Sequence, residues 1–308
     1  MSDIALVTGC SGFIGRHCAR ELADRGYIVF GLDVASMPDA QNWGLRQFWQ
    51  AQVSAAVLDD VALRHGLPQC IIHCAGSGAV SVSIQNPYAD FIANVQSAME
   101  ALDFSRRNNS AIKVVLPSSA AVYGNIAVSH LAEHMAGHPT SPYGAHKKIM
   151  EDLAASYGKN FGVPGVCVRL FSVYGVGLKK QLLWDACRKA KCGEFSFFGN
   201  GAEERDWLHV KDAVRLLILA VEHASPSVPL VNGGTGKETS TKEVLTMLGG
   251  DWSPALSPRF TGHTRVGDPY RLVADISCLR KWGFAPCIPL EQGLHEYVRW
   301  FQGQIRHD

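Results

Sequence analysis

The first 33 residues carry the pattern that most constrains the fold. A short apolar run of β-type residues, Ile4 to Val7, leads directly into a glycine-rich turn, Thr8-Gly9-Cys10-Ser11-Gly12-Phe13-Ile14-Gly15. An amphipathic stretch continues to about Arg25, and a second apolar run from Tyr27 to Leu32 ends at Asp33. Strand, glycine turn, helix and strand in this order predict a βαβ unit, which belongs in a parallel sheet.

The glycine turn has the chemistry of a dinucleotide site. Glycine lets the backbone turn sharply and approach a pyrophosphate, and the free N–H groups at a helix start attract its negative charge. Asp33 follows Gly15 by roughly 20 residues, where a carboxylate accepts both ribose hydroxyls of NAD and repels the 2′-phosphate of NADP. We therefore expect NAD as the cofactor. The alternative is a βαβ turn with a structural role only.

Strands and helices alternate up to about residue 174. We expect a polar loop over 34–50, strands over 48–53, 70–75, 112–116 and 165–170, and helices to about 65, over 87–107 and over 143–161. This order predicts the α/β class, with a Rossmann-type doubly wound parallel sheet in residues 1–174. A later strand near 228–232 is expected to return to that sheet, while residues 175–308 form mainly a smaller C-terminal substrate-binding lobe.

Two polar motifs lie where a ligand is expected. Ser119 follows the strand over 112–116, and the carboxyl ends of parallel strands line the ligand crevice. Tyr143 and Lys147 are four residues apart, so on a helix they share one face. An ammonium beside a phenol favours the phenolate, which predicts a lowered pKa for Tyr143 and a role in proton transfer. Taken alone, the pair also fits an exposed tyrosine above a surface lysine.

Composition excludes several other classes of partner. The 308 residues carry a formal net charge of +1 without a basic block, which gives no support for nucleic acid or a membrane surface as partner. No apolar run reaches the roughly 18 residues of a membrane span. Nine cysteines, several in apolar runs and none in Cys-x-x-Cys spacing, indicate reduced core thiols, no metal site and a cytoplasmic location.

Further motifs extend along almost the whole chain. They are His73-Cys74-Ala75-Gly76, Asn94-Val95, Ser118-Ser119-x-x-Val122-Tyr123-Gly124, Ser141-Pro142-Tyr143-x-x-x-Lys147, Arg169-Leu170-Phe171-x-Val173-Tyr174-Gly175, Arg205-Asp206-Trp207-Leu208-His209-Val210-x-Asp212 and Arg265-Val266-Gly267-Asp268. Together with the glycine turn and Asp33, they resemble the extended short-chain dehydrogenase/reductase family, in its nucleotide-sugar epimerase and dehydratase branch.

The resemblance implies roles at specific positions. The catalytic group would be Ser119, Tyr143 and Lys147, with Tyr143 as general base for a sugar hydroxyl. Lys147 would lower its pKa and hold the nicotinamide ribose. NAD would be contacted by Gly9, Gly12, Phe13, Ile14, Gly15, Asp33, Gln52, Ala75, Gly76, Asn94, Tyr143 and Lys147.

The resemblance also implies a nucleotide-diphosphate sugar as substrate. Its contacts would be Ser119, Tyr143, Ser172, Phe198, Arg205, Arg265 and Asp268. The two arginines match positions that grip the pyrophosphate, for which bidentate guanidinium donors are well suited. The family further implies a homodimer, formed through the helix near residues 90 to 107 and the helix of Tyr143.

Departures from the family's pattern narrow the reaction. Sugar 4,6-dehydratases of this family carry an Asp-Glu pair after the catalytic hydroxyl residue, where this chain has Ala120 and Ala121. A methyl group cannot shuttle a proton, so elimination of water is disfavoured. Gln52, Gly78 and Ser172 also depart from common family residues, which leaves the identity of the sugar open.

Two further motifs resemble functional sites but are better explained as structural elements. His130-Leu131-Ala132-Glu133-His134 fits a short metalloprotease pattern, but no apolar helical run surrounds it, so we expect no zinc. Gly233-Gly234-Thr235-Gly236-Lys237 suggests a phosphate loop, yet it lacks the required first glycine. We expect a turn from strand to helix there.

The residues therefore favour an NAD-dependent nucleotide-sugar 4-epimerase that acts through a transient 4-keto intermediate. A nucleotide-sugar 4-ketoreductase or 4-dehydrogenase would use the same residues but change the cofactor's redox state. A non-catalytic NAD-binding regulator is the alternative from another class.

Overall fold

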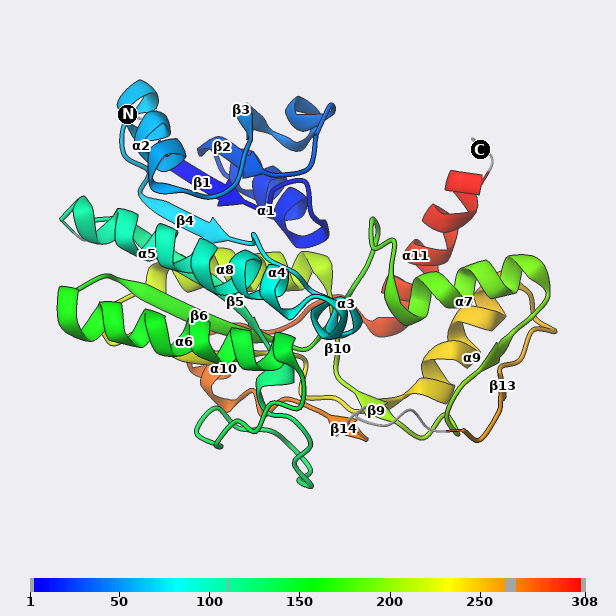
Figure 1. Cartoon of the computed structure of the whole chain (residues 1–308). Coiled ribbons are helices and arrows are strands. Elements are labelled where there is room, and N and C mark those ends of the chain that lie inside the picture. The colour runs from blue at the N-terminus through cyan, green and yellow to red at the C-terminus, as the bar shows by residue number, and fades with distance from the viewer. Residues whose placement is uncertain (1–2, 110, 264–269, 306–308) are drawn as a thin grey trace. The chain divides into compact units, whose positions relative to one another are not determined.

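The computed structural model describes residues 3–109, 111–263 and 270–305 and divides into two compact units (Figure 1). The first unit comprises residues 1–124, 136–170 and 214–231, and the second comprises residues 125–135, 171–213 and 232–308. Both units are therefore assembled from separate stretches of the chain.

A seven-stranded sheet forms the centre of the first unit, in the order β11-β6-β5-β4-β1-β2-β3. The strands are β1 (Ile4–Thr8), β2 (Ile28–Asp33), β3 (Leu45–Gln50), β4 (Cys70–His73), β5 (Lys113–Ser119), β6 (Gly165–Leu170) and β11 (Leu230–Gly233). The pairs from β3 through to β6 are all parallel. The order reverses beside β1, which is the switch point where α/β sheets bind ligands.

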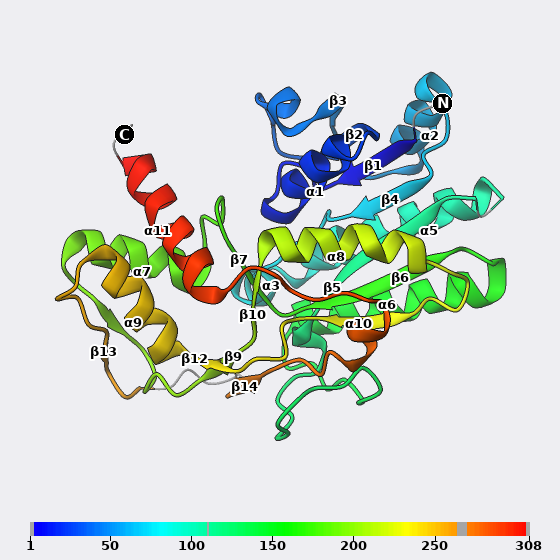
Figure 2. The ribbon, with the colours of Figure 1, turned by 180° about the vertical axis from the view of Figure 1, so that it is seen from behind.

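Helices cover both faces of this sheet, as the prediction of a doubly wound fold requires. Figure 1 shows α2 (Ala55–His65), α5 (Ser97–Arg107) and α6 (Pro142–Phe161) on one face. Figure 2, the view from behind, shows α1 (Phe13–Asp24) and α8 (Val210–His223) on the other. Strand residues such as Leu6, Ile71 and Val114 pack against Ala98 and Leu102 of α5 in a fully buried core. The predicted fold class is confirmed.

Several predicted boundaries are confirmed closely, and others need correction. Helix α6 and strand β6 have the expected bounds. The strand expected over 48–53 instead spans Leu45–Gln50, at the edge of the sheet. Its Arg46 and Gln47 are exposed, so this edge strand lacks the apolar pattern that marks the inner strands. Similarly, the returning strand starts at Leu230 rather than at Val228.

The helix expected over 87–107 contains an irregularity. It consists of α4 (Pro87–Phe91), a π-helical turn (Ile92–Gln96) and α5 (Ser97–Arg107). A short helix α3 (Val80–Gln85) precedes it. Single π turns in α-helices are frequent at functional sites, and this one carries Asn94.

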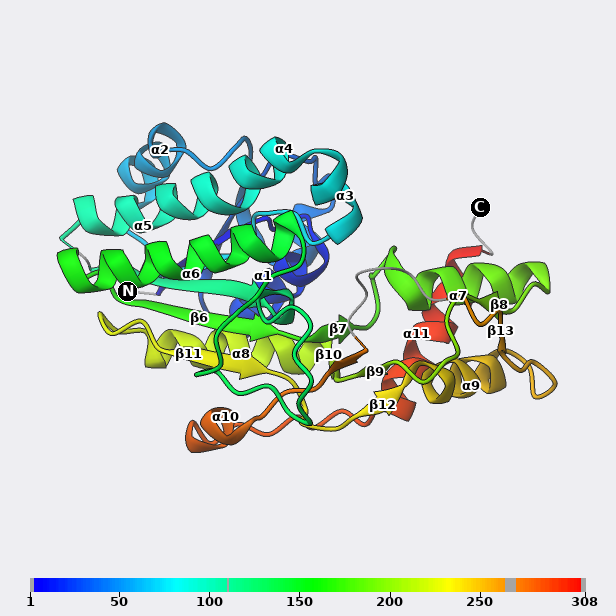
Figure 3. The same ribbon diagram turned by 60° about the horizontal axis from the view of Figure 1, so that its bottom comes forward.

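The second unit contains short strands and a helical layer (Figure 3). Its strands are β7 (Ser172–Tyr174), β8 (Ser196–Phe197), β9 (Glu204–Arg205), β10 (Trp207–His209), β12 (Thr239–Ser240), β13 (Arg259–Phe260) and β14 (Arg271–Leu272). Its helices are α7 (Gln181–Cys192), α9 (Thr241–Trp252), α10 (Ser277–Lys281) and α11 (Leu290–Ile305). Aromatic contacts such as Trp184 with Phe301 join α7 to α11. None of the helices in the described ranges is long and apolar enough to cross a membrane.

Candidate active site

The glycine turn after β1 is too tight for larger residues. Gly9 has a φ of +65°, and a Cβ there would lie 2.5 Å from the backbone of Cys74 and Ala75. A Cβ on Gly15 would lie 2.1 Å from the carbonyl oxygen of Gly9. The turn therefore brings the start of α1 directly against the end of β4, as a dinucleotide site requires.

Asp33 lies at the end of β2, next to this turn. Its Oδ2 accepts a hydrogen bond from Ser11 N at 3.0 Å, and its Oδ1 accepts one from Ala35 N at 3.0 Å. These contacts hold the carboxylate beside the glycine turn while both oxygens keep further acceptor capacity. Gln52, expected near the adenine, is exposed beyond the end of β3.

A buried hydrogen-bond chain links β1, β4 and α5. Ala75 N donates to Thr8 Oγ, which lies 2.9 Å from His73 Nδ1, and His73 Nε2 lies 3.1 Å from Ser97 Oγ. Because Ser97 Oγ donates to Ala93 O, it accepts from His73, which fixes the neutral tautomer with hydrogen on Nε2. Burial, with a smaller contribution from Lys147, lowers the pKa of His73 to about 3. This network was not anticipated from the sequence.

Asn94 is buried on the π turn. Its Nδ2 donates to Asp90 O at 3.1 Å, whereas its Oδ1 has no partner among the described residues. A Cβ on Gly76 would lie 2.6 Å from this oxygen, so the residue at position 76 must be small. An unsatisfied buried oxygen beside a glycine turn fits a bound group with a hydrogen-bond donor.

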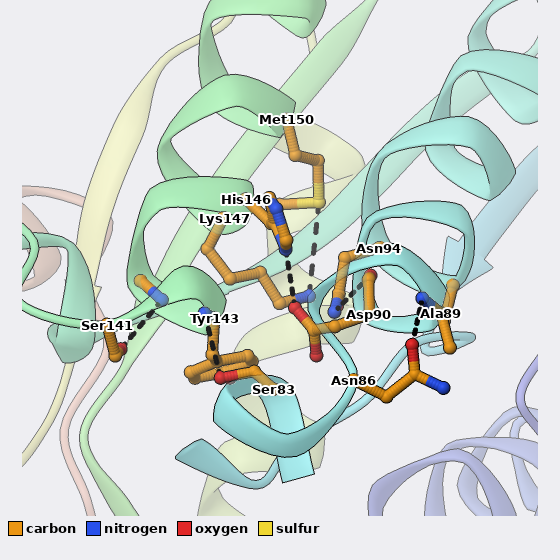
Figure 4. Close-up of polar contacts among 12 residues, drawn as sticks. Ser83, Asn86, Ala89, Asp90, Asn94, Ser141, Tyr143, His146, Lys147 and Met150 are labelled. Atoms are coloured by element: carbon orange, nitrogen blue, oxygen red, sulfur yellow. Dashed lines mark hydrogen bonds and ion pairs between the residues drawn. The ribbon is translucent and has the colours of Figure 1, made fainter. Parts of the chain in front are cut away.

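Local capping positions the expected catalytic side chains. Ser141 accepts a hydrogen bond from Gly144 N at 3.2 Å and caps α6, with Pro142 in its first turn. Ser119 accepts one from Ala121 N at 3.1 Å at the end of β5, and its hydroxyl also bonds Tyr143. The structure therefore brings Ser119 and Tyr143 together. Lys147, one turn farther along α6, is buried (Figure 4).

The electrostatics of the pair differ from the expectation. Burial raises the pKa of Tyr143, while the Ser119 hydrogen bond acts in the opposite direction. The predicted lowering of the Tyr143 pKa was therefore wrong, because burial outweighs the hydrogen bond from Ser119. The Lys147 Nζ instead donates to Pro117 O at 3.0 Å, and burial lowers the pKa of this lysine to about 8.

A buried ion pair supports the same region. Glu151 on α6 accepts two hydrogen bonds from Arg169 on β6, at 2.9 and 2.8 Å, and a third from Ser118 at 2.6 Å. The Arg169 guanidinium also lies 4.6 Å from the centre of the Tyr123 ring. These contacts join α6 to the ends of β5 and β6. They fix the position of the helix that carries Tyr143 and Lys147.

A second buried pair, which was not anticipated, lies beside Lys147 (Figure 4). Asp90 on α4 has its Oδ2 2.6 Å from the Nδ1 of His146 on α6, and its side chain is 0% exposed (Figure 4). His146 stands inside the Tyr-x-x-x-Lys motif at a position that the motif leaves variable. Its pairing partner lies 56 residues earlier in the chain, which no local pattern reveals.

The expected substrate residues of the second unit have varied surroundings. Arg205 on β9 is half-buried and donates to the carbonyl oxygens of Glu204 and Tyr270. Ser172 begins β7 and is half-buried, while Phe198 is 57% exposed. Arg265 and Asp268 lie outside the described residues.

The two remaining motifs make contacts within the protein. Glu133 accepts a hydrogen bond from Asn232 N at 2.8 Å, which gives it a structural partner. The donors of the Gly233–Lys237 turn bond a carboxylate of the protein itself, since Thr235 N and Gly236 N donate to Asp206. Helix α9 then begins at Thr241, so the expected turn from strand to helix is confirmed. Within the described ranges, no group of three or more His, Cys, Asp or Glu could hold a metal ion.

The chain is similar to known proteins over almost its whole length. A family model described as NAD dependent epimerase/dehydratase matches residues 5–232. The UDP-glucose 4-epimerase of Thermotoga maritima, solved with UDP-glucose, is 26% identical with a TM-score of 0.90 and covers 98% of this chain and 99% of its own. The Thermus thermophilus UDP-glucose 4-epimerase, solved with NAD, is 26% identical with a TM-score of 0.87, covering 97% and 99%. UDP-glucuronate 4-epimerase 2 of Arabidopsis thaliana is 25% identical over 98% of this chain and 76% of its own length.

Proposed function

Because the chain belongs to the NAD dependent epimerase/dehydratase family, we propose that it is a nucleotide-sugar 4-epimerase that acts through a transient 4-keto sugar. One observation carries this choice within the family. Ser119 and Tyr143 are joined by a hydrogen bond, and the two residues after Ser119 are alanines. With Ala120 and Ala121 there, the site has no acid pair for eliminating water, so the sugar keeps all its hydroxyl groups.

Tyr143 is the group that moves the proton. Its phenolate takes the proton of the C4 hydroxyl and later returns it, while Ser119 donates a hydrogen bond that orients the reacting oxygen. The Lys147 ammonium stabilises the phenolate when the site is filled. When bound, NAD supplies a reversible hydride acceptor, so the reaction needs no net oxidant.

In this proposal the cofactor belongs to the first unit. Its glycine turn, Asp33 and Gln52 bind the adenosine and pyrophosphate half of NAD. The nicotinamide half is bound by Gly76, Asn94 and Lys147. The unsatisfied Oδ1 of Asn94 supports this assignment.

The nucleotide diphosphate of the substrate is assigned to the second unit. Arg205 and Arg265 grip the pyrophosphate, Ser172 contacts a phosphate, Phe198 lies beside the base and Asp268 binds the ribose. The sugar itself reacts at Ser119 and Tyr143.

The proposal includes a homodimer and a cytoplasmic location. Helices α5 and α6 pack side by side, and each exposes an apolar side chain, Met99 at 39% and Ile149 at 40%. Nearby Tyr88 and Phe91 on α4 are also exposed. Exposed apolar residues on adjacent helices favour a partner surface. The nine free thiols fit a reducing compartment.

The test uses purified protein with UDP-, GDP- and dTDP-sugars and follows the configuration at C4 by proton NMR. We expect inversion at C4 with at least one substrate and no net change in NADH absorbance. Tyr143→Phe should lower the rate by about 10²–10⁴-fold while leaving NAD bound. Stoichiometric production or consumption of NADH would instead identify a dehydrogenase or ketoreductase. Absence of inversion with every sugar would contradict the proposal.

A further inference from the structure

Asp90 is a buried carboxylate on α4 that contacts α6, the helix of Tyr143 and Lys147. It lies on α4, where its backbone oxygen accepts the hydrogen bond from Asn94 Nδ2. Its side chain contacts His146, which stands between Tyr143 and Lys147 on α6. The residue therefore touches elements that carry three of the expected site residues.

The charge of Asp90 is only partly satisfied. Its Oδ2 is bonded to His146 Nδ1, but its Oδ1 has no hydrogen-bond partner among the described residues. A buried carboxylate normally requires several donors or a nearby cation, because removing it from water costs several kcal/mol. The Nδ1 of His146 satisfies only one of the two carboxylate oxygens, so Oδ1 is left for another donor or a cation.

Lys147 is a buried positive charge that lacks a carboxylate in direct contact within the described ranges. Its ammonium is buried and donates to Pro117 O and to the Met150 sulfur, and no carboxylate in the described ranges lies within ion-pair distance of Nζ. Figure 4 shows its side chain extending toward the Asp90 carboxylate. Burial lowers the pKa of Lys147 to about 8, and the acidic groups around it, Cys74 and Asp90 first among them, act in the opposite direction.

The other titratable groups around Lys147 cannot replace Asp90 at neutral pH. These groups are His73 on β4, Cys74 after β4, Cys167 on β6 and Glu151 on α6. Tyr143 lies one turn before Lys147 on the same helix (Figure 4). Thiols and phenols are ordinarily uncharged at pH 7, and His73 is neutral. Glu151 is already paired with Arg169. Asp90 is therefore the carboxylate whose charge is left for Lys147.

We propose that Asp90 is the counter-charge that keeps the Lys147 ammonium protonated in its buried site, and that His146 holds Asp90 in position. Asp90 is thus a positioning residue that acts through Lys147. The role of the ammonium in stabilising the Tyr143 phenolate rests on the proposed function. The electrostatic interaction between Asp90 and Lys147 does not depend on it.

The sign of the effect follows from the buried charges. An ammonium beside a carboxylate keeps its proton to higher pH, so removing the carboxylate lowers the pKa of Lys147. Lys147 is protonated below its pKa and loses its proton as the pH rises through about 8 in the present chain. Without Asp90, the loss occurs at a lower pH, and the reaction loses its cation within the neutral range.

The experiment measures the Lys147 titration directly in the full-length protein with NAD. Protein labelled with [ε-¹³C]lysine is titrated by NMR, and Lys147→Arg identifies the signal. We expect Asp90→Asn to lower the midpoint by about one pH unit or more. His146→Asn keeps an amide donor at the position of Nδ1 and should leave the midpoint within a few tenths. Asp152→Asn, which removes an exposed carboxylate of the same helix, should also leave it unchanged.

The outcomes separate this inference from the proposed function, since the titration requires no substrate. An unchanged midpoint in folded, NAD-binding Asp90→Asn would overturn the counter-charge. An equal shift in His146→Asn would also overturn it, because packing rather than charge would then be responsible. If Asp90→Asn does not fold, Asp90→Ser removes the same charge in a smaller volume. Where a substrate is found, the basic limb of the kcat pH profile should shift with the midpoint.

Discussion

Asp33 supports the glycine turn, and we propose that the same side chain selects the cofactor. One oxygen holds Ser11 N at 3.0 Å and the other holds Ala35 N at 3.0 Å, so the carboxylate fixes the turn beside which a ribose would lie. Asp33→Asn keeps an acceptor oxygen but removes the charge that repels a 2′-phosphate. We expect NAD binding to weaken and the preference for NAD over NADP to fall by about 10-fold or more.

Calorimetric titration of cofactor-free protein with NAD and with NADP measures this preference. Asp39→Asn is the matched control. Asp39 follows Asp33 by six residues, and its carboxylate accepts a hydrogen bond from Trp43 Nε1. A ratio of affinities that stays the same in Asp33→Asn would mean that Asp33 serves the turn alone.

Residues with local signals were predicted from the sequence, and residues paired over long distances were not. Gly9, Gly15 and Ser141 stand at turns and caps whose requirements are local. By contrast, the partner of Asp90 lies 56 residues away and that of Glu151 lies 18 residues away. Likewise, the direction of the Tyr143 pKa depends on burial, which the spacing to Lys147 does not encode.

At the scale of elements, the start of α6 is clamped by a second helix. Ser83 on α3 is buried, and its Oγ accepts a hydrogen bond from Tyr143 N at 3.1 Å while donating to Val80 O at 2.7 Å. Ser83→Ala leaves the Tyr143 amide without this acceptor. We expect a loss of about 1 kcal/mol in the free energy of unfolding, or a melting temperature lower by about 2–4 °C.

Differential scanning calorimetry measures the change, with Ser81→Ala as control, since Ser81 lies on the same helix but is exposed. Equal stability of the two variants would show that water replaces the lost acceptor. The epimerase rate of Ser83→Ala should fall more than its stability explains, because Tyr143 is the residue that loses its anchor.

Elements with strong boundary signals were predicted well. Helix α6 has the expected bounds, and its start has a serine cap and a proline in the first turn. In the structure it ends at Gly162, which adopts the left-handed conformation. The π turn within the helix over 87–107 was not predicted, because an extra residue in a helical turn leaves the apolar pattern nearly intact. The edge strand β3 was displaced because its exposed residues resemble a loop.

At the scale of the whole molecule, the order of motifs predicted the sheet but not the composition of the two units. Residues 125–135 belong to the second unit although they lie within the N-terminal half. They join it through backbone hydrogen bonds of Leu131 with Val273 and Asp275, more than a hundred residues later. The local sequence carries no signal for pairing between residues so far apart in the chain.

The proposed homodimer is the whole-molecule property that the fold makes testable. Helix α6 has 20 residues and is therefore about 30 Å long. The segment from α4 through the π turn and α5 is about as long, so with packed helices about 10 Å apart the outer face of α4, α5 and α6 offers on the order of 600 Å². This area approaches the roughly 800 Å² per partner of a stable interface. An interface of that size tolerates a buried ammonium group poorly.

We therefore expect the double variant Met99→Lys/Ile149→Lys to be monomeric, since each substitution places an unpaired charge in the apolar contact. Leu63→Lys is the control, because Leu63 is 87% exposed on α2, outside the proposed interface. Light scattering after size-exclusion chromatography measures the mass of each protein. Two chains are expected for the parent and for Leu63→Lys, and one chain for the double variant. A parent mass of one chain would refute the dimer, and a dimeric double variant would place the interface on another surface.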